Sequence, residues 1–534
     1  PATRRSFQAV RVAAPLRIDG QLDEEFYRSA APLSDFVQIE PVDGAPATEK
    51  TDVWFAFDDD QIYIAFRCWD SHPELRVAKE MRRDNGTIWN GDDNVAFILD
   101  TFLDRRNSFQ FTINAIGGRQ DAQVFNERQW VGDWNTIWKS ATGRFDGGWT
   151  AEAAIPFKSL RYQPGREQTW GFNAMRTSRW KNEISFLVPV PKAQGQRGLL
   201  QASLAAPLEG LRVPDGSRNV EIKPYAIANA KQDRTSRVLL GDVGVDGKYG
   251  ITQNLTADFT YNTDFAQAEA DEQQVNLTRF SLFFPEKREF FLEGQGIFAF
   301  GTTAQNAGGD VPTLFYSRRI GLDRGGVVPV DGGGRLTGRV GRFTVGAIDI
   351  HSRRESSLGV EPTNFSVLRV RRDILRRSSV GAMFTGRSTM VDQAGGNATV
   401  GVDGIFAFYD NLGINTYWAR TDTGSNRDTS YRGQLDYAGD RYGVQLERLM
   451  VGRRFDPGIG YVQRPNMQRS SANARFSPRP RRNAVVRKYT FYSALDYIEN
   501  LDGVLESRSR TAKFQTDLQN ADGFAVTYTN QFER

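Results

Sequence analysis

Side chains able to perform nucleophilic or acid–base chemistry are unevenly supplied in this chain. It has one cysteine, Cys68, and two histidines, His72 and His351, which lie far apart. With so few of these side chains, a Cys–His or Ser–His catalytic arrangement or a histidine zinc site is improbable. A single cysteine also excludes a disulfide within the chain. Acids such as Asp121 and Glu152 are plentiful, but no spacing singles out the pair that a glycoside hydrolase needs. We predict a protein without catalysis, with a glycan-processing enzyme as an alternative.

Two acidic clusters supply the hard oxygen ligands that calcium prefers. One is the run of three aspartates at 58–60, and the other combines Asn90 with Asp92 and Asp93. Neither fits the regular twelve-residue calcium loop, so solvated turns are the favoured interpretation. We predict no cofactor and keep calcium, with Asp92 and Asp93 as its ligands, as the alternative.

Three tryptophans, Trp130, Trp134 and Trp138, follow one another at intervals of four residues. Aromatic faces stack on sugar rings while nearby polar groups bond the hydroxyls, so this set is a candidate carbohydrate platform. Hydrophobic packing under a loop, or a contact with the rim of a barrel, is the favoured interpretation. The spacing of four would also suit core packing of one helical face.

The segment around residues 264–300 mixes charged and aromatic residues without strand alternation. Irregular backbone at membrane depth must be shielded by protein or water, so we predict an inward constriction or plug. The alternative is a structured loop held by ion pairs outside the membrane. The candidate constriction residues are Asp264, Glu269, Asp271, Glu286, Arg288 and Glu293, with Arg318 and Arg319 as partners for the acids.

Period-two alternation dominates the second half of the chain. In residues 255–262, Leu, Ala, Phe and Tyr alternate with Thr, Asp, Thr and Asn, and residues 431–437 and 442–447 repeat the pattern. Such a period places each set on one face of a sheet. A soluble antiparallel sheet would alternate in the same way. Aromatic residues at strand ends, strands over roughly 300 residues and charges on the opposite face favour a membrane β-barrel.

Length and composition agree with two β-rich domains. The chain has 534 residues, 12% of them aromatic, 51 glycines and a net charge of only +4. No run of about 20 apolar residues predicts a membrane helix, and no clustered basic charge predicts nucleic-acid binding. Short strands at residues 53–57 and 62–66, separated by an acidic turn, are typical of a β-sandwich.

We therefore predict a sandwich over residues 1–210, a linker at 211–217 and a barrel over 218–534. Because the chain begins at Pro1, we expect a removed signal peptide or a chosen boundary. The chain ends in Arg534 instead of the aromatic residue usual for outer-membrane barrels, so the sequence leaves open whether the barrel is complete there.

Several motifs resemble known families. RIDGQLDEEF at 17–26, WNGDD at 89–93 leading into FILD at 97–100, and GWTAEAAIP at 148–156 resemble carbohydrate-binding module family 9 domains. A second group is similar to the signature of a barrel family of unassigned function, the domain of unknown function 5916 type. That group consists of NTDFAQAEAD at 262–271, QVNLTRF at 274–280, PEKREFFLEG at 285–294 and FYSRRIG at 315–321. In that family the barrel follows a family 9 type module. The resemblance thus implies an all-β chain: an antiparallel sandwich, then an antiparallel transmembrane barrel.

The resemblance also bears on sugar binding. Trp89 stands where the family has a sugar-stacking tryptophan, but the family's acidic residue corresponds to Ala96 and its arginine to Thr112. Its second stacking tryptophan belongs near residues 190–198, where this chain has no aromatic residue. The resemblance thus implies a retained sandwich whose sugar clamp is mostly lost. A scaffolding or docking module is favoured, and Trp89, Trp130 and Trp134 remain the candidate sugar-binding residues.

These predictions combine into a bacterial outer-membrane protein that acts as a conduit or an envelope-assembly component. A carbohydrate-binding protein anchored by its barrel, aiding glycan capture, is the main alternative. The expected partners are outer-membrane lipid and either a glycan or another envelope protein, with no nucleic acid.

Overall fold

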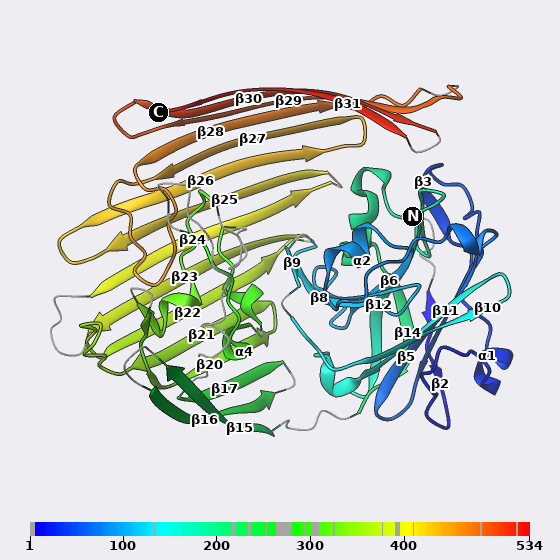
Figure 1. Cartoon of the computed structure of the whole chain (residues 1–534), viewed down its shortest axis with the longest axis horizontal. Helices are drawn as coiled ribbons and strands as arrows, with labels where there is room; N and C mark the ends of the chain where they lie inside the picture. Colours follow the sequence, from blue (N-terminus) through cyan, green and yellow to red (C-terminus); the bar gives the residue numbers. More distant parts are fainter. Residues whose placement is uncertain are drawn as a thin grey trace. The chain divides into compact units, whose positions relative to one another are not determined.

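The computed structural model describes most of the chain and divides it into two compact units (Figure 1). Unit 1 comprises Pro1–Ser217, Arg479–Lys488 and Asp517–Gly523, and unit 2 comprises Arg218–Pro478, Tyr489–Thr516 and Phe524–Arg534. The described residues are 6–127, 129–132, 134–163, 165–214, 220–232, 237–252, 254–262, 280, 282–292, 294–301, 309–323, 326–375, 377–389, 396–409, 411–480, 483–519 and 522–534.

Unit 1 contains two β-sheets. The larger has nine strands: β1 (Phe7–Gln8), β3 (Val37–Glu40), β6 (Asn94–Asp100), β7 (Ser108–Asn114), β8 (Arg119–Phe125), β9 (Gln129–Val131), β12 (Glu167–Ser178), β13 (Glu183–Phe186) and β14 (Ala206–Arg212). The smaller has five: β2 (Val10–Arg11), β4 (Thr51–Phe57), β5 (Gln61–Trp69), β10 (Lys139–Phe145) and β11 (Gly148–Pro156). Pairing is antiparallel except for β1 with β14 and β2 with β4, which are parallel.

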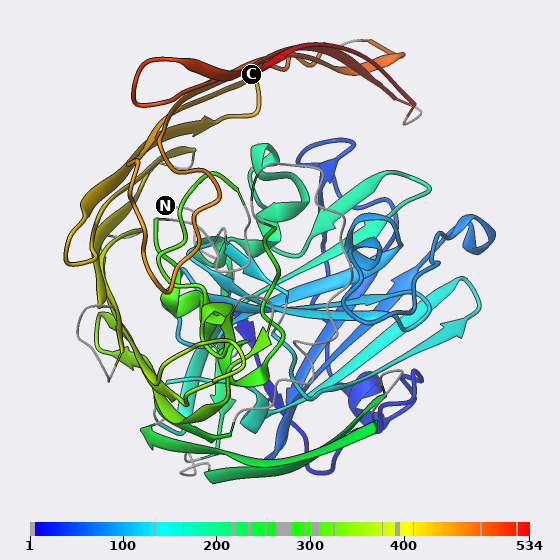
Figure 2. The same cartoon turned by 60° about the vertical axis from the view of Figure 1, so that its left-hand side comes forward.

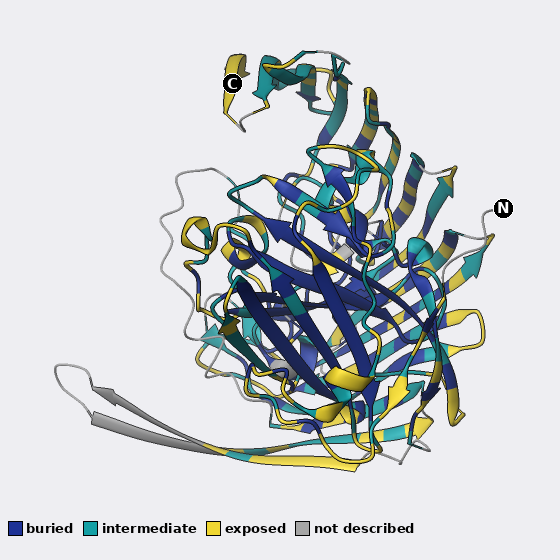
Figure 3. Ribbon diagram, turned by 90° about the vertical axis from the view of Figure 1, so that its right-hand side faces the viewer, coloured by how far each residue is buried: buried dark blue, intermediate teal, exposed yellow. Residues whose placement is uncertain are grey.

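The core of unit 1 forms from alternate side chains of both sheets, as sandwich packing requires. Phe66 of β5 stacks on Phe97 of β6 at 6.1 Å between ring centroids, and Phe97 stacks on Phe111 of β7 at 5.3 Å. Trp149 and Trp170 are fully buried in the same core. Strands β4, β6 and β7 are buried along their whole length, and central strands of this unit are dark blue in Figure 3 because both of their faces are covered.

The helices formed by the described residues are short. Those of unit 1 are α1 (Glu25–Ser29), α2 (Gly86–Asn90), η1 (Pro73–Leu75), η2 (Phe157–Ser159), η3 (Lys192–Leu200) and η4 (Ala202–Leu204). Those of unit 2 are α4 (Glu289–Leu292), η5 (Gln295–Phe298) and η6 (Ser317–Arg319). Within the described ranges, no helix has the length and apolar character needed to cross a membrane.

Unit 2 is built on one fifteen-stranded antiparallel sheet. Apart from the step from β17 to β20, each strand pairs with the next strand in the chain. Its strands are β15 (Val220–Gln232), β16 (Arg237–Thr252), β17 (Leu255–Tyr261), β20 (Val330–Val340), β21 (Phe343–Ser352), β22 (Thr363–Ile374), β23 (Ser378–Thr389), β24 (Asn397–Phe408), β25 (Leu412–Asp422), β26 (Arg427–Ala438), β27 (Tyr442–Val451), β28 (Met467–Phe476), β29 (Val486–Glu499), β30 (Leu505–Leu518) and β31 (Gly523–Glu533). A two-stranded ribbon, β18 (Leu322–Asp323) with β19 (Gly326–Val327), lies between β17 and β20 in the chain.

The large sheet curves strongly from β15 to β31, with a concave and a convex side (Figure 2). In the described part of the chain no ladder joins the two end strands, β15 and β31. Hairpin turns alternate in length: the turns after β20, β22, β24 and β26 are short, whereas the loops after β21 and β27 are long. The prediction of an all-β chain with an N-terminal sandwich and a large antiparallel, barrel-like sheet is confirmed.

Candidate functional site

The two faces of the large sheet differ in chemistry. One face, here called the inner face, carries Arg335, Arg369, Asp403, Arg432 and Glu447. The other, the outer face, carries the alternating apolar residues, such as those of β25, β26 and β27. Period-two alternation produces this separation because successive side chains of a strand point to opposite faces. The strands are accordingly banded in yellow and blue in Figure 3.

Opposite charges on neighbouring strands pair across the inner face. Arg335 of β20 contacts Asp258 of β17 at 2.9 Å, and Arg432 of β26 contacts Glu447 of β27 at 2.5 Å. Arg369 of β22 donates two hydrogen bonds, of 2.7 and 2.8 Å, to Asp403 of β24 across the intervening strand. These pairs are nearly buried, so removing one partner would leave an uncompensated charge.

The chain between β17 and β20 enters the concave side of the sheet. Its described part, residues 282–292, 294–301 and 309–323, is here called the inner segment, and it appears green in Figure 2. A hydrophobic cluster joins the two. It includes Phe290, Phe298, Phe300 and Phe315 of the inner segment and Ile348, Ile350, Phe365, Val367 and Met383 of the sheet.

Inner-face charges also hold the backbone of the inner segment. Arg335 donates to the carbonyl oxygen of Phe290, and Arg432 donates to that of Gly301 at 3.2 Å. The amide of Gly301 donates to Asp403 at 3.1 Å. The same ion pairs that bridge the strands therefore satisfy backbone groups of Phe290 and Gly301, which belong to no strand.

Glu286 and Arg288, two of the predicted constriction residues, form a buried pair within the inner segment. Arg288 donates to both carboxylate oxygens of Glu286, at 2.9 and 2.7 Å. It also donates to the carbonyl oxygens of Ser317 and Ile320, each at 2.8 Å. This pair therefore connects α4 to η6 and fixes the fold of the segment.

Arg318 and Arg319, predicted as partners for the acids, make backbone contacts. Arg318 donates to the carbonyl oxygen of Pro285 at 3.0 Å, and Arg319 donates to that of Gly460 at 3.2 Å. The remaining predicted constriction residues, Asp264, Glu269, Asp271 and Glu293, lie outside the described residues.

Sequence reasoning missed the strand residues that hold the inner segment, Arg335, Arg369 and Asp403 among them. The alternation placed Arg432 and Glu447 on a polar face, but it contained no information about which strand positions the segment would reach. Cross-strand register supplies that information, and register depends on the turns as well as on the strands.

In unit 1, Trp89 is half-buried on α2. Its carbonyl oxygen accepts hydrogen bonds from Arg179 at 2.9 Å and Gln196 at 2.8 Å. Ala96 is fully buried in a cluster with Phe186 and Leu199. Apolar packing thus occupies the position that the resemblance assigns to an acidic sugar ligand.

The three spaced tryptophans have different surroundings. Trp134, 8% exposed, packs against Phe109 with ring centroids 4.9 Å apart, and Trp138 is also part of the core. Trp130 is 40% exposed, and its indole N–H donates to Gln110 at 2.9 Å. Of the three, Trp130 alone offers a substantial open surface.

The carboxylates of Asp92 and Asp93 are engaged by N–H donors. Asp92 accepts from the amides of Lys79 and Glu80, each at 3.1 Å, and from the side chain of Asn114 at 2.7 Å. Asp93 accepts from the amides of Val77 and Arg179. The two residues tie the loop before α2 to the sheet. No group of three or more potential metal ligands occurs in the described ranges.

Glu152 is a buried acid on β11. It accepts from the amide of Gly20 at 2.7 Å and the hydroxyl of Tyr27 at 2.9 Å. Burial raises the pKa of Glu152 to about 7, against the lowering effect of these hydrogen bonds. The acid joins the N-terminal loop to the sheet, and no second carboxylate among the described residues is hydrogen-bonded to it.

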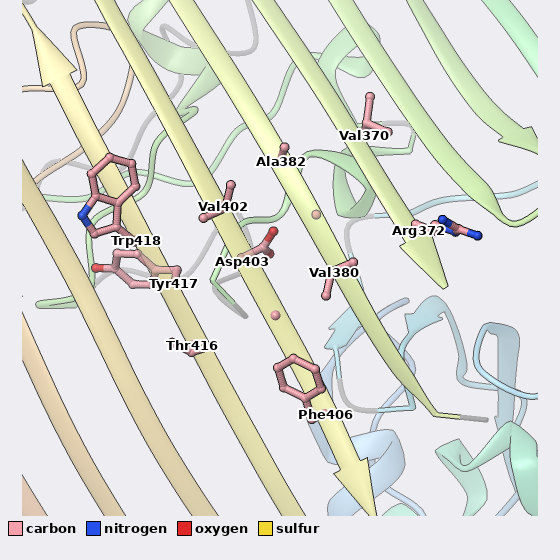
Figure 4. A pocket seen from close by; sticks show the side chains of 12 residues that line it. Val370, Arg372, Val380, Ala382, Val402, Asp403, Phe406, Thr416, Tyr417 and Trp418 are labelled. Atoms are coloured by element: carbon pink, nitrogen blue, oxygen red, sulfur yellow. The ribbon is translucent and has the colours of Figure 1, made fainter. Parts of the chain in front are cut away.

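The outer face leaves large apolar side chains exposed over successive strands. The exposed fraction is 58% for Phe259, 53% for Val402 and 42% for Trp418. The outer-face set also includes Leu368, Val380, Phe384, Val400, Tyr431, Leu435, Tyr437, Tyr442, Val444, Leu446, Phe491 and Leu495. A hollow opens on this face between β22 and β25 (Figure 4).

Two family models match the chain. Residues 18–184 match the model of the carbohydrate family 9 binding domain-like family. Residues 219–364 match the domain of unknown function DUF5916. The two matches fall in the order and in the parts of the chain that the sequence motifs predicted.

Solved structures with similarity to the chain fall into two groups. A family 9 carbohydrate-binding module from Caldicellulosiruptor kristjanssonii, solved with cellotriose, is 16% identical, covers 39% of this chain and 95% of its own, and gives a TM-score of 0.28. A putative carbohydrate-binding protein from Bacteroides uniformis is 13% identical, with coverages of 40% and 100% and a TM-score of 0.31. OccAB2 from Acinetobacter baumannii is 9% identical, with coverages of 84% and 94% and a TM-score of 0.27. No curated protein sequence matches the chain.

Proposed function

We propose that this protein resides in a bacterial outer membrane, where unit 2 spans the bilayer and forms a conduit narrowed by the inner segment. The observation that carries the proposal is the exposed apolar outer face of the fifteen-stranded sheet. Exposing so much contiguous apolar surface to water would be unfavourable, whereas lipid accommodates it. The polar inner face then lines the lumen.

The inner segment supports a restricted passage. Its aromatic residues and the ion pairs of Arg335, Arg369 and Arg432 cover part of the inner face, which reduces the space left for solutes. Selectivity in such a pore depends on the charges and dimensions of its lining. Unit 1 would act in docking or envelope assembly, and the proposal includes no catalytic step.

Membrane fractionation and conductance test the proposal directly. We expect the full chain to be extracted only with detergent from outer-membrane fractions, and to migrate differently on a gel before and after heating. In planar bilayers, purified protein should produce discrete conductance steps that a heat-denatured sample lacks. A monodisperse protein in buffer without detergent would contradict the membrane location.

Carbohydrate capture by unit 1 is a second candidate, favoured by the family match over residues 18–184. It predicts binding on a glycan array that is lost in Trp89→Ala or Trp130→Ala. A Trp180→Phe variant, altered outside the candidate residues, serves as a control. Equal binding by the wild type and the three variants would show that neither Trp89 nor Trp130 belongs to the sugar site.

A further inference from the structure

The hollow on the outer face, of about 590 Å³, is lined by residues of four neighbouring strands (Figure 4). Small residues, Ala382 and Gly404, leave space between the larger side chains of Val402, Phe406 and Trp418. A Cβ at Gly404 would come within 2.7 Å of the Phe406 ring, so the absence of a side chain helps to keep the hollow open.

Arg372 is an exposed cation at the border of this hollow. In the strand register it stands opposite Phe343 on one side and Val380 on the other. Its guanidinium lies 5.4 Å from the centroid of the Phe343 ring. No acidic side chain forms an ion pair with Arg372 in the described part of the chain.

The nearest acids in the strand register are already occupied. Asp373, the next residue, belongs to the inner face and contacts Arg339 at 2.9 Å. Asp403, also at the hollow, is held by both terminal nitrogens of Arg369. Arg372 therefore lies beside an aromatic ring and apolar neighbours, and no acid among the described residues forms an ion pair with it.

The position of Arg372 near the end of its strand would place it at the depth of the lipid headgroups. It lies two residues before the end of β22, near the short turn to β23. The short turn after β26 lies at the same end, and there Arg441 stands 5.5 Å from the Tyr442 ring and 5.3 Å from the Phe476 ring. Aromatic residues with basic side chains are characteristic of membrane–water interfaces, where long cations reach the headgroup layer.

We propose that Arg372 and the hollow form a binding site for an anionic phospholipid, with its phosphate on the guanidinium and one acyl chain against Ala382, Val402 and Trp418. This inference rests on the proposed function, because it requires the outer face to meet a bilayer. A guanidinium binds phosphate through two parallel N–H donors, and the hollow supplies apolar contact for the chain.

Trp418 offers a selective probe of the site, because it is the one tryptophan of unit 2 and lines the hollow. The full chain is reconstituted in phosphatidylcholine bilayers that contain increasing fractions of acyl-brominated phosphatidylglycerol or acyl-brominated phosphatidylcholine. Bromine quenches a tryptophan that it contacts. The contribution of Trp418 is the difference between the wild type and Trp418→Phe.

We expect brominated phosphatidylglycerol to quench Trp418 at about a fivefold lower mole fraction than brominated phosphatidylcholine, as one interfacial arginine would produce. Arg372→Gln should abolish this preference, and Ala382→Phe should weaken quenching by both lipids. Arg427→Gln removes an exposed arginine that pairs with Asp422 at 2.7 Å at the opposite end of the strands, and should change nothing.

The outcomes separate this inference from the proposed function. Equal quenching by the two lipids in the wild type, or an unchanged preference in Arg372→Gln, would overturn the lipid site while leaving membrane insertion intact. Absence of quenching by either lipid, with no flotation of the protein with vesicles, would contradict the proposed function itself.

Discussion

Several buried carboxylates of unit 1 serve as anchors for backbone amides. Asp92 and Asp93 hold the loop that precedes α2, and Glu152 holds the N-terminal loop through Gly20. A carboxylate that accepts several N–H donors satisfies polar groups which would otherwise be buried without partners. Their contribution should therefore appear in stability measurements.

Asp92→Ala should lower the free energy of unfolding of unit 1 by about 2–4 kcal/mol, because it leaves the amides of Lys79 and Glu80 and the buried Asn114 side chain without this acceptor. Nine of the ten tryptophans precede residue 210, so tryptophan fluorescence during denaturant unfolding reports mainly on this unit. Asp59→Ala, which breaks only an exposed ion pair with Arg11, should have no comparable effect.

The same unfolding experiment tests whether Asp92 and Asp93 bind calcium. We expect neither calcium nor a chelator to shift the unfolding midpoint of the wild type, since amide donors already engage both carboxylates. A calcium-dependent shift that disappears in Asp92→Ala would instead establish the alternative interpretation of the Asp92 and Asp93 cluster.

Glu152 should make unit 1 less stable as the pH rises. Its pKa is about 7 in the folded chain, above the ordinary value of 4.5, so the folded state keeps a proton that the unfolded state has released between these values. The free energy of unfolding should fall across pH 4.5–7, by an amount of the order of 3 kcal/mol.

Glu152→Gln should remove that fall, measured as the difference in unfolding free energy between pH 5 and pH 8. The exposed Glu167→Gln variant provides the control and should retain the wild-type pH dependence. Parallel pH profiles for wild type and Glu152→Gln would contradict the assignment.

At the scale of elements, the inner segment depends on the strands that surround it. Its apolar residues contact inner-face side chains of β21, β22 and β23, and its backbone is held by Arg335, Arg432 and Asp403. Coupling through Asp403 is direct, because this carboxylate accepts both from Arg369 and from the amide of Gly301.

Arg369→Gln should loosen this attachment. It leaves Asp403 as a buried charge without its main partner, a change that typically costs 3–5 kcal/mol. We expect the unheated gel form to convert at lower temperature and, in planar bilayers, a larger or noisier conductance. Arg427→Gln, which breaks an exposed ion pair, should behave like the wild type. An unaltered conductance in Arg369→Gln would show that the inner segment does not restrict the pore.

The sequence predicts some contacts of the inner segment but not others. Loss of alternation in the sequence separated this segment from the strands, and its described residues form α4, η5 and η6 between β17 and β18. The pairing of Glu286 with Arg288 could be predicted from the sequence, because the two residues are only two positions apart. The attachment to Arg335 and Asp403 was not, because it depends on contacts between residues far apart in the chain.

At the scale of the whole molecule, the outer face determines the environment that unit 2 requires. Alternation in residues 431–437 predicted which side chains share a face, and the structure leaves Tyr431, Leu435 and Tyr437 exposed. Fold class could be predicted because period and turn signals are local properties of the sequence. The hollow could not, because it results from the relative positions of small and large residues on four strands.

Val402→Arg should impair assembly of unit 2 in bilayers. A charged side chain on the lipid face of a barrel costs about 2–4 kcal/mol near the middle of the bilayer. We expect a smaller fraction of the heat-modifiable form after refolding into vesicles. Val402→Leu, which keeps the apolar character, should assemble normally, and equal assembly of the arginine variant would place Val402 in contact with water.

Chain order places the inner segment ahead of almost all the strands that later cover it. Its aromatic residues, such as Phe298 and Phe315, are synthesised before β21 through β29, whose inner faces supply Ile348, Met383 and Ile498. Because each of these strands pairs with its predecessor, successive hairpins can be added along one growing edge while the segment is still accessible. We therefore expect unit 2 to assemble around an early aromatic nucleus, with insertion of the segment preceding the final curvature of the sheet.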